Sequence, residues 1–133
     1  MTLEVTISTP EKTYPATQAD EIILSTNSGQ MGVLTDHAPV ITGLDVGVML
    51  MRQQREWKSF ALNTGYAFIK ENRVLVQVTD AEAASEINAT EAEQAYEKAL
   101  RDNENASDTK QKLEAKIVLK RAKARFQAVQ AVA

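Results

Sequence analysis

Residues able to do chemistry lie closest together in the stretch 29–39, which reads GQMGVLTDHAP. It contains the only histidine of the chain, His37, directly after Asp36. A Ser-His-Asp mechanism would have to use His37, yet no nucleophile elbow lies near it in the sequence. A histidine before Ala-Pro more commonly fills a turn and bonds to the backbone, while Pro39 keeps the preceding residue extended. We therefore interpret this stretch as a contact surface and not as a catalytic loop.

Metal and cofactor chemistry finds no support elsewhere in the sequence. The chain has no cysteine, so it offers neither disulfides nor thiolate ligands, and a reducing compartment is the simpler assumption. One histidine with scattered carboxylates does not supply the ligand spacing of a metal site. Gly29 and Gly32 are not followed by the lysine of a phosphate-binding loop. We expect no metal, no cofactor and no catalytic residue.

The composition indicates what kind of scaffold positions this stretch. The chain has 133 residues, of which 44% are hydrophobic and 25% charged, as in one globular domain with or without a small appendage. Its apolar runs are short, and no basic segment followed by a hydrophobic one opens the sequence. We expect a soluble protein that meets a membrane only through its partners.

Strands are predicted up to about Thr79, because apolar and polar residues alternate there, as in a sheet with one buried face. The alternating positions are Leu3, Val5 and Ile7, then Val48 and Leu50, Phe60 and Leu62, and Val74, Val76 and Val78. The continuous apolar run 22–24 predicts a strand that is buried more completely. Turn signals separate these segments, so we expect an antiparallel sandwich or barrel.

Helices are predicted after Asp80, where glycine and proline stop and the apolar period changes. Asn88 with Glu91, or Thr90 with Glu93, can form a capping box for a first helix, and Asp108 can cap a second one after the turn-prone segment 102–108. The apolar faces are Ala92, Ala95, Tyr96, Ala99 and Leu100 in the first helix, and Ala115, Val118, Leu119, Ala122, Phe126 and Val129 in the second. Alanine buries little area, so we expect a hairpin able to detach. The predicted fold class is α+β, an N-terminal antiparallel β-sandwich followed by a C-terminal α-helical hairpin.

Charge is distributed unevenly along the chain, although the net charge is only −3. Residues 1–79 carry −2, residues 80–108 carry −7 and residues 109–133 carry +6. This separation is typical of oppositely charged helices that lie together, of a solvated helix face, or of a basic arm that binds an acidic partner. Nucleic acid fits less well, because the whole protein is acidic and aromatic residues are few. One interpretation is an autonomous β-sandwich adaptor whose basic C-terminal helix binds an acidic protein or RNA.

A second interpretation comes from a family resemblance. The stretch 21–39 (EIILSTNSGQMGVLTDHAP), the following ITGLDVGVMLMR and the late LKRAKARFQAV together resemble the ε subunit of F-type ATP synthase. The resemblance spans essentially the whole chain. It is greatest for the chloroplast and cyanobacterial branch, and especially for the green-algal plastid form.

The resemblance implies a non-catalytic rotor subunit that couples proton flow to ATP synthesis. Residues 1–84 would form a sandwich that binds the γ subunit and the ring of c subunits, and residues 85–133 a regulatory helical hairpin. The expected location is the stromal side of the thylakoid membrane, or the cytoplasmic side in a cyanobacterium. The contact residues that the resemblance implies are Ser28, Gly29, Gln30, Met31, Gly32, His37, Ala38 and Pro39, with Gln30 at the tip of the loop.

The resemblance also implies a regulatory role for the hairpin. In the family it folds beside the sandwich or extends along γ toward the α and β subunits, where it impedes ATP hydrolysis. The residues implied for that contact are Lys120, Arg121, Lys123 and Arg125, in agreement with the basic charge of the second helix.

Two short segments depart from the family pattern. Many bacterial members bind ATP through a motif in which an aspartate and an arginine stand where this chain has Asn88 and Glu91. An acid in place of the arginine would repel phosphate, so we expect weak or no ATP binding. Thr35 and Asp36 also replace a proline-containing turn before the histidine.

Overall fold

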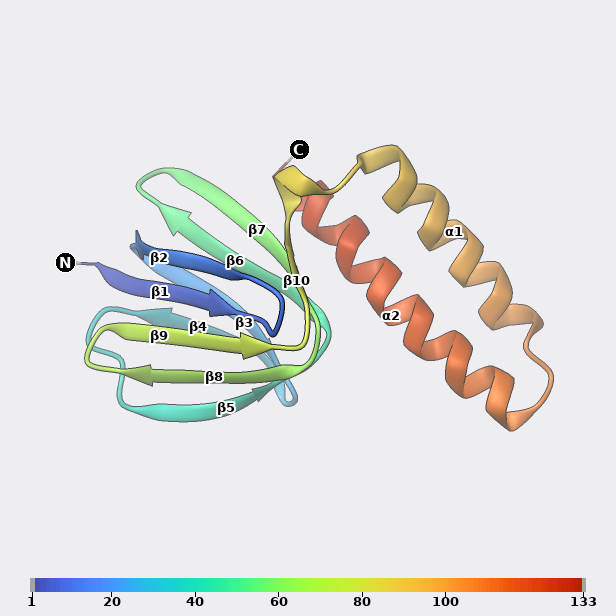
Figure 1. The fold of residues 1–133 in the computed structure, drawn as a ribbon, viewed down its shortest axis with the longest axis horizontal. Coiled ribbons are helices and arrows are strands. Elements are labelled where there is room, and N and C mark those ends of the chain that lie inside the picture. The colour runs from blue at the N-terminus through green and yellow to red at the C-terminus, as the bar shows by residue number, and fades with distance from the viewer. Residues whose placement is uncertain (1, 133) are drawn as a thin grey trace.

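The computed structural model describes residues 2–132, which form a β-sandwich and a pair of helices that projects from one side of it (Figure 1). The elements in chain order are β1 (Leu3–Ser8), β2 (Thr13–Ala19), β3 (Glu21–Thr26), β4 (Gly29–Leu34), β5 (Val40–Leu44), β6 (Gly47–Gln53), β7 (Glu56–Leu62), β8 (Gly65–Lys70), β9 (Arg73–Val78), β10 (Ala81–Ala83), the short 3-10 helix η1 (Ala84–Glu86), α1 (Ala89–Asn105) and α2 (Thr109–Ala131). The predicted order of a β-sandwich followed by a helical hairpin is confirmed.

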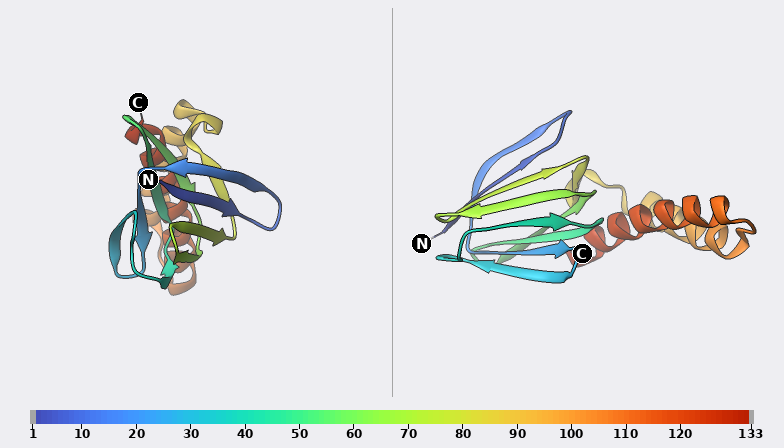
Figure 2. Two further views of the ribbon diagram at one scale, coloured as in Figure 1. Left: turned by 90° about the vertical axis from the view of Figure 1, so that its left-hand side faces the viewer. Right: turned by 90° about the horizontal axis from the view of Figure 1, so that it is seen from below.

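The strands of the described chain join in one hydrogen-bonded sheet that curls into the layers of the sandwich (Figure 2). Their order is β10-β7-β6-β3-β5-β8-β9-β1-β2, with β4 paired to β3. Neighbouring strands are antiparallel except β1 and β9, which run parallel with Val5 opposite Val74. An alternating pattern carries no information on strand direction, so the sequence analysis missed this exception.

Tyr14 connects the two end strands of the sheet, β2 and β10. Its hydroxyl donates to the carboxylate of Glu86 and lies 3.3 Å from both the carbonyl oxygen of Ala81 and the amide nitrogen of Ala83. Its ring packs edge-on against Phe60, with ring centroids 5.5 Å apart. Burial and the bond to Glu86 raise the pKa of Tyr14, and the same bond lowers the pKa of Glu86. The linker to the helices is therefore anchored as far as Glu86.

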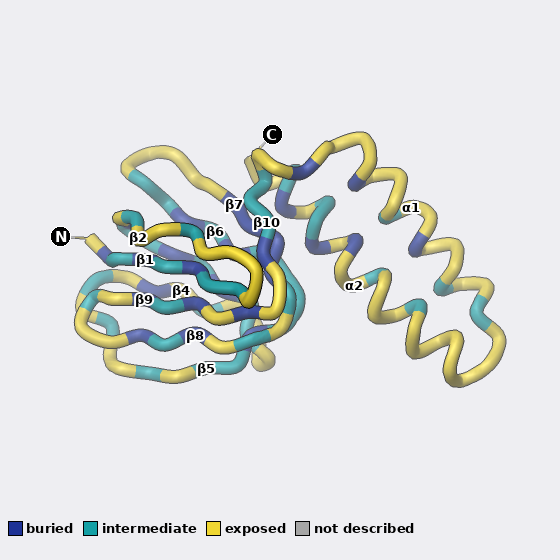
Figure 3. The backbone as a smooth tube through the Cα atoms, in the orientation of Figure 1, coloured by how far each residue is buried: buried dark blue, intermediate teal, exposed yellow. Residues whose placement is uncertain are grey.

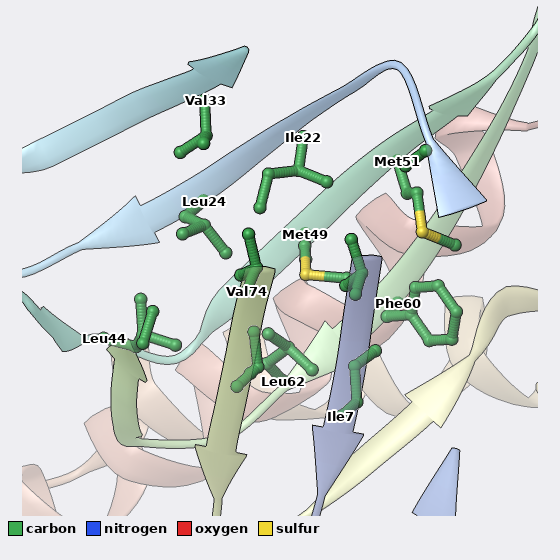
Figure 4. Packing of buried hydrophobic residues seen from close by; sticks show 14 of the residues in the cluster. Ile7, Ile22, Leu24, Val33, Leu44, Met49, Met51, Phe60, Leu62 and Val74 are labelled. Carbon is green, nitrogen blue, oxygen red and sulfur yellow. The ribbon is translucent and has the colours of Figure 1, made fainter. Parts of the chain in front are cut away.

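The core lies between the two layers of the sandwich. Its side chains include Leu3, Val5, Ile7, Ile22, Leu24, Val33, Leu44, Met49, Met51, Phe60, Leu62, Val74, Val76 and Val78 (Figure 4). The prediction of full burial for 22–24 is wrong for Ile23, because β3 alternates and Ile23 is only half-buried. In β6 the core residues are the two methionines, whereas the predicted Val48 and Leu50 are half-buried on the opposite face.

The end of β7 and the adjoining start of β6 pack against α2, which removes the alternation of burial in the second half of β7 (Figure 3). Ser59, Phe60, Ala61 and Leu62 are all buried. A second, small cluster consists of Ala61, Ile87, Ala92 and Ala128, with Val48 and Val129 packed against it. Because α2 packs on its outer face, the second half of β7 is buried on both faces of the sheet.

Of the two caps predicted for the first helix, the structure has Asn88 and places Thr90 inside the helix, and the predicted cap at Asp108 is confirmed. Asn88 Oδ1 accepts the Glu91 amide at 3.0 Å, and Asp108 Oδ1 accepts the Gln111 amide at 2.7 Å. The first helix runs to Asn105, so it includes the first four residues of the segment predicted as a turn. Between the helices, the rings of Tyr96 and Phe126 stack with centroids 5.3 Å apart.

Candidate interaction surfaces

The stretch 28–32 forms one side of a β-hairpin and not a loop. The turn residues are Asn27 and Ser28, and Gly29 follows with a φ of 123°, a conformation that glycine adopts without strain. The Thr26 hydroxyl bonds to the Gly29 carbonyl at 2.6 Å and closes the turn. Gln30 pairs with Ser25 inside the ladder, so the expectation that Gln30 forms the tip is wrong. The exposed tip of this hairpin is the pair Asn27 and Ser28.

The predicted turn at His37 lies at the other end of β4. His37 Nδ1 is 2.7 Å from the carbonyl oxygen of Ala38, so the ring bonds to adjacent backbone, as expected for a turn residue. Asp36 has a φ of 65°, and its amide donates to Asn72 Oδ1 at 2.6 Å. This bond ties the turn before β5 to the turn between β8 and β9.

The structure therefore does not bring the predicted contact residues together. Ser28 precedes β4 and His37 follows it, and a strand of this length spans roughly 20 Å. The turn at Ser28 lies beside the β5–β6 connection, where the Asp45 amide bonds to the Ser25 carbonyl at 3.0 Å. The two groups, 28–32 and 37–39, can contact two different partners.

An apolar row crosses the outer face of β5, β8, β9 and β1. Ile41 pairs with Phe68, Phe68 with Leu75, and Leu75 with Thr6, so these side chains are neighbours on one face. Ile41 is 68% exposed, and Tyr66, on the same face, is 59% exposed. Ile41, Phe68 and Leu75 line an unfilled groove of about 830 Å³ that also includes Pro39. We call this face the apolar groove.

The apolar groove was not predicted from the sequence, although the residues of β8 and β9 carry a signal for it. In β8 both Phe68 and its neighbour Ile69 are apolar, and in β9 Leu75 lies between two buried valines. When a strand is apolar on both faces, the face that points away from the core must be covered by another element or by a partner protein. In β7 that cover is α2, whereas in β8 and β9 the described chain provides none.

Two of the four basic residues implied for the regulatory contact bind the sandwich instead. Lys120 Nζ lies 2.9 Å and 3.0 Å from the two carboxylate oxygens of Asp45. Arg125 binds Glu82 through Nε at 2.9 Å and Nη2 at 3.2 Å. The bond from Lys120 is the main cause that lowers the pKa of Asp45. Arg121 and Lys123 are exposed in this arrangement.

The start of α1 is unsuited to binding phosphate in the structure, as the sequence predicts. Asn88 uses its side-chain oxygen to cap α1, and Glu91 is exposed in the first turn. An acid there is favoured by the helix dipole, and it would oppose an anionic ligand.

Within residues 2–132, no three His, Asp or Glu side chains gather as they would around a metal ion. No helix in the same part of the chain is long and apolar enough to cross a membrane.

Comparison with known proteins gives consistent matches in sequence. A family model described as "ATP synthase, Delta/Epsilon chain, beta-sandwich domain" matches residues 2–84. A protein of Tetradesmus obliquus named "ATP synthase epsilon chain, chloroplastic" is 52% identical over 132 residues, covering 99% of this chain and 97% of the relative. A protein of Tupiella akineta with the same name is 50% identical over 129 residues, covering 97% and 99%.

Solved structures show the same fold at lower sequence identity. A chain in the mitochondrial ATP synthase of Euglena gracilis, in a structure of OSCP, F1 and c-ring, superposes with a TM-score of 0.80 at 20% identity, covering 98% of this chain and 80% of that one. A chain in the central stalk and c-ring of the Tetrahymena thermophila enzyme gives 0.61 at 20% identity, covering 98% and 96%. With a matching sandwich, a matching helical hairpin and relatives of about half-identical sequence along nearly the whole length, the chain belongs to the ATP synthase ε-chain family, whose members are non-catalytic subunits.

Proposed function

We propose that the protein is a central-stalk subunit of a proton-translocating F-type ATP synthase, that it joins the γ subunit to the c-ring, and that its helices inhibit ATP hydrolysis. The observation that carries the proposal is the apolar groove. Soluble monomers rarely leave a contiguous apolar row of this kind in water, so the face is suited to a permanent partner. One matching chain belongs to a solved central stalk and c-ring, and another to a solved assembly of OSCP, F1 and c-ring.

The γ subunit is the partner we assign to the apolar groove. The centre of the groove is apolar, at Ile41 and Phe68, and charged residues such as Glu4 and Arg73 lie at its edge. An apolar centre with a polar rim is the usual anatomy of a stable protein interface. His37, Ala38 and Pro39 lie at or next to the groove, so we assign them to the γ contact.

The c-ring is the partner we assign to the other end of β4. Ser28, Gly29, Gln30 and Gly32 are exposed, and Met31 is half-buried against the core. The tight turn keeps this end narrow, and the polar side chains suit contact with the polar surface loops of a membrane ring. The separation of the two groups along β4 supports two simultaneous contacts by one sandwich.

The inhibitory contact is assigned to the basic residues Lys120, Arg121, Lys123 and Arg125 of α2. Arg121 and Lys123 are free for an acidic surface on α or β while the hairpin lies on the sandwich. Charges that become partly desolvated at an interface contribute more than charges in solvent. From the names of the relatives, we place the complex in the chloroplast, at the stromal side of the thylakoid membrane.

The test is the ATPase activity of a catalytic head that has been depleted of its own ε subunit. We expect the full chain to bind and inhibit, and a chain truncated after Ala89 to bind without inhibiting. A full-length variant with Arg121→Ala, Lys123→Ala and Arg125→Ala should inhibit less while its circular dichroism spectrum stays unchanged. A matched variant with Lys98→Ala, Arg101→Ala and Lys110→Ala removes the same charge from the far part of the hairpin.

The outcomes separate the proposal from its alternative. Equal inhibition by the truncated and full chains would refute the role of the helices, and equal effects of the two triple variants would refute the assignment of the basic residues. Failure of every form to bind the head, together with salt-dependent RNA binding, would favour the autonomous adaptor.

A further inference from the structure

The hairpin is joined to the sandwich mainly through the C-terminal half of α2. The buried residues of that half are the alanines Ala122, Ala124 and Ala128, with Val129 partly buried, which is little apolar area for a contact between two structural units. The Ser59 hydroxyl donates to the carbonyl of Ala128, one of the last helix carbonyls, which lack partners within the helix. The far end of the hairpin, with the α1–α2 turn, points away from the sandwich (Figure 1).

The covalent connection does not itself hold the hairpin in place. The linker is anchored by Tyr14 as far as Glu86, and α1 begins at Ala89. Ile87 and Asn88 lie between these points, and neither belongs to a strand or helix. Rotation about their backbone would release both helices together without disturbing the strands, so noncovalent contacts must decide the position of the hairpin.

The strongest of these contacts by geometry are the two ion pairs. Glu82 and Arg125 form a bidentate pair, with side chains 28% and 35% exposed. Asp45 receives Lys120 on both carboxylate oxygens, with side chains 39% and 56% exposed. Bidentate, charge-assisted pairs are the stronger members of their class, and partial burial protects them from screening. Both carboxylates belong to the sandwich, and both cations belong to α2.

We propose that Asp45 and Glu82 form an electrostatic latch that holds α2 on the sandwich and competes with an acidic partner surface for Lys120 and Arg125. The partner can bind these two cations only after both ion pairs break. The latch therefore sets how readily the hairpin is released. The competition rests on the proposed inhibitory function, whereas release of the hairpin in the isolated chain does not.

The experiment measures release in the isolated full-length protein by energy transfer. The natural chain has no cysteine, so Thr79→Cys in the sandwich and Asn105→Cys at the far end of the hairpin allow two dyes to be attached without background labelling. In this labelled chain, Asp45→Asn with Glu82→Gln should raise the ratio of released to docked hairpin about two- to thirtyfold. Raising the salt from about 0.05 to about 0.5 M should favour release in the parent chain and have little effect in the double variant.

The control variant carries Glu4→Gln and Glu21→Gln. It changes the net charge by as much as the latch variant does. It also breaks two ion pairs that lie entirely within the sandwich, Glu4 with Arg73 and Glu21 with Arg52. Its hairpin should stay docked. A swapped variant, Asp45→Lys with Lys120→Asp, restores one pair with reversed charges and should dock again relative to Asp45→Lys alone.

Three results decide between the latch and the function on which it depends. Equal release in the latch and control variants, or no recovery in the swapped variant, would overturn the latch. Greater release together with stronger inhibition of the catalytic head supports the latch and the competition. Greater release with unchanged inhibition keeps the latch and refutes its competition with the partner surface, whereas the inhibitory function itself is refuted only if the truncated and full chains inhibit equally.

Discussion

Truncation of Ile41 to alanine tests the apolar groove, because this side chain is the most exposed apolar one on that face. Full burial of an isoleucine side chain contributes about 1.5–3 kcal/mol. Since Ile41 is 68% exposed in the free chain, a partner that covers it can gain about 1–2 kcal/mol. The Ile41→Ala variant should therefore bind the ε-depleted catalytic head about five- to thirtyfold more weakly. Its thermal stability should hardly change, because the side chain packs on little in the free chain.

Affinity is measured by titrating the immobilised catalytic head with the variant, which reports on γ because this head contains no c-ring. The matched control is Leu34→Ala, which removes an apolar side chain of similar size and 55% exposure on β4, outside the groove. Ile41→Glu should weaken binding further, since it places a charge in a dry contact. Unchanged affinity of both Ile41 variants, or an equal loss in the Leu34 control, would refute the groove as the γ-binding surface.

Four further outcomes are expected. Tyr14→Phe should cost about 1–2 kcal/mol of unfolding free energy by chemical denaturation, and this difference should vanish above pH 10, because a raised folded pKa means that the stabilisation is lost as the pH rises through it. Gly65→Ala should cost at least about 2 kcal/mol in the same assay, because its Cβ would lie 2.0 Å from the Gln77 carbonyl oxygen, where only backbone could move; a stable variant would contradict that clash. The labelled chain should release its hairpin as the pH falls below 3.8, the ordinary pKa of an aspartate. Because docking lowers the pKa of Asp45, the stabilisation from its pair with Lys120 is complete above that pH and is lost as Asp45 becomes protonated. An Asp45→Asn chain should show less of this response. Calorimetry should detect no ATP binding, and a micromolar dissociation constant would disprove our interpretation of the departures from the nucleotide motif.

Local patterns predicted much of the fold. Alternation identified β1 and β9 because each has one side toward the core, and candidate caps that included Asn88 and Asp108 located both helix starts because a cap acts on amides two or three residues away. The same logic failed for β6, where Val48 and Met49 are both apolar. Alternation cannot tell which of two apolar faces meets the core when a distant helix covers the other.

The candidate sites were predicted less completely than the fold. The His37 turn was recognised from Ala-Pro next to it, and its local backbone bond was expected. The sequence placed Gln30 at a tip, because spacing alone does not show that Ser25 pairs with it in a ladder. The basic charge of α2 was visible in the sequence, whereas its acidic counterparts are 75 and 43 residues away in the chain.

The sequence by itself determined the order of sheet and helices, the helix caps, the turn at His37 and the membership in a family, because each depends on neighbouring residues or on residue identity. The tertiary structure alone decided three other features: the apolar groove, the distance between the two ends of β4, and the pairing of Lys120 and Arg125 with Asp45 and Glu82. All three arise from strand order and helix docking. These bring together residues that no local pattern connects, and they are selected by burial summed over the whole chain.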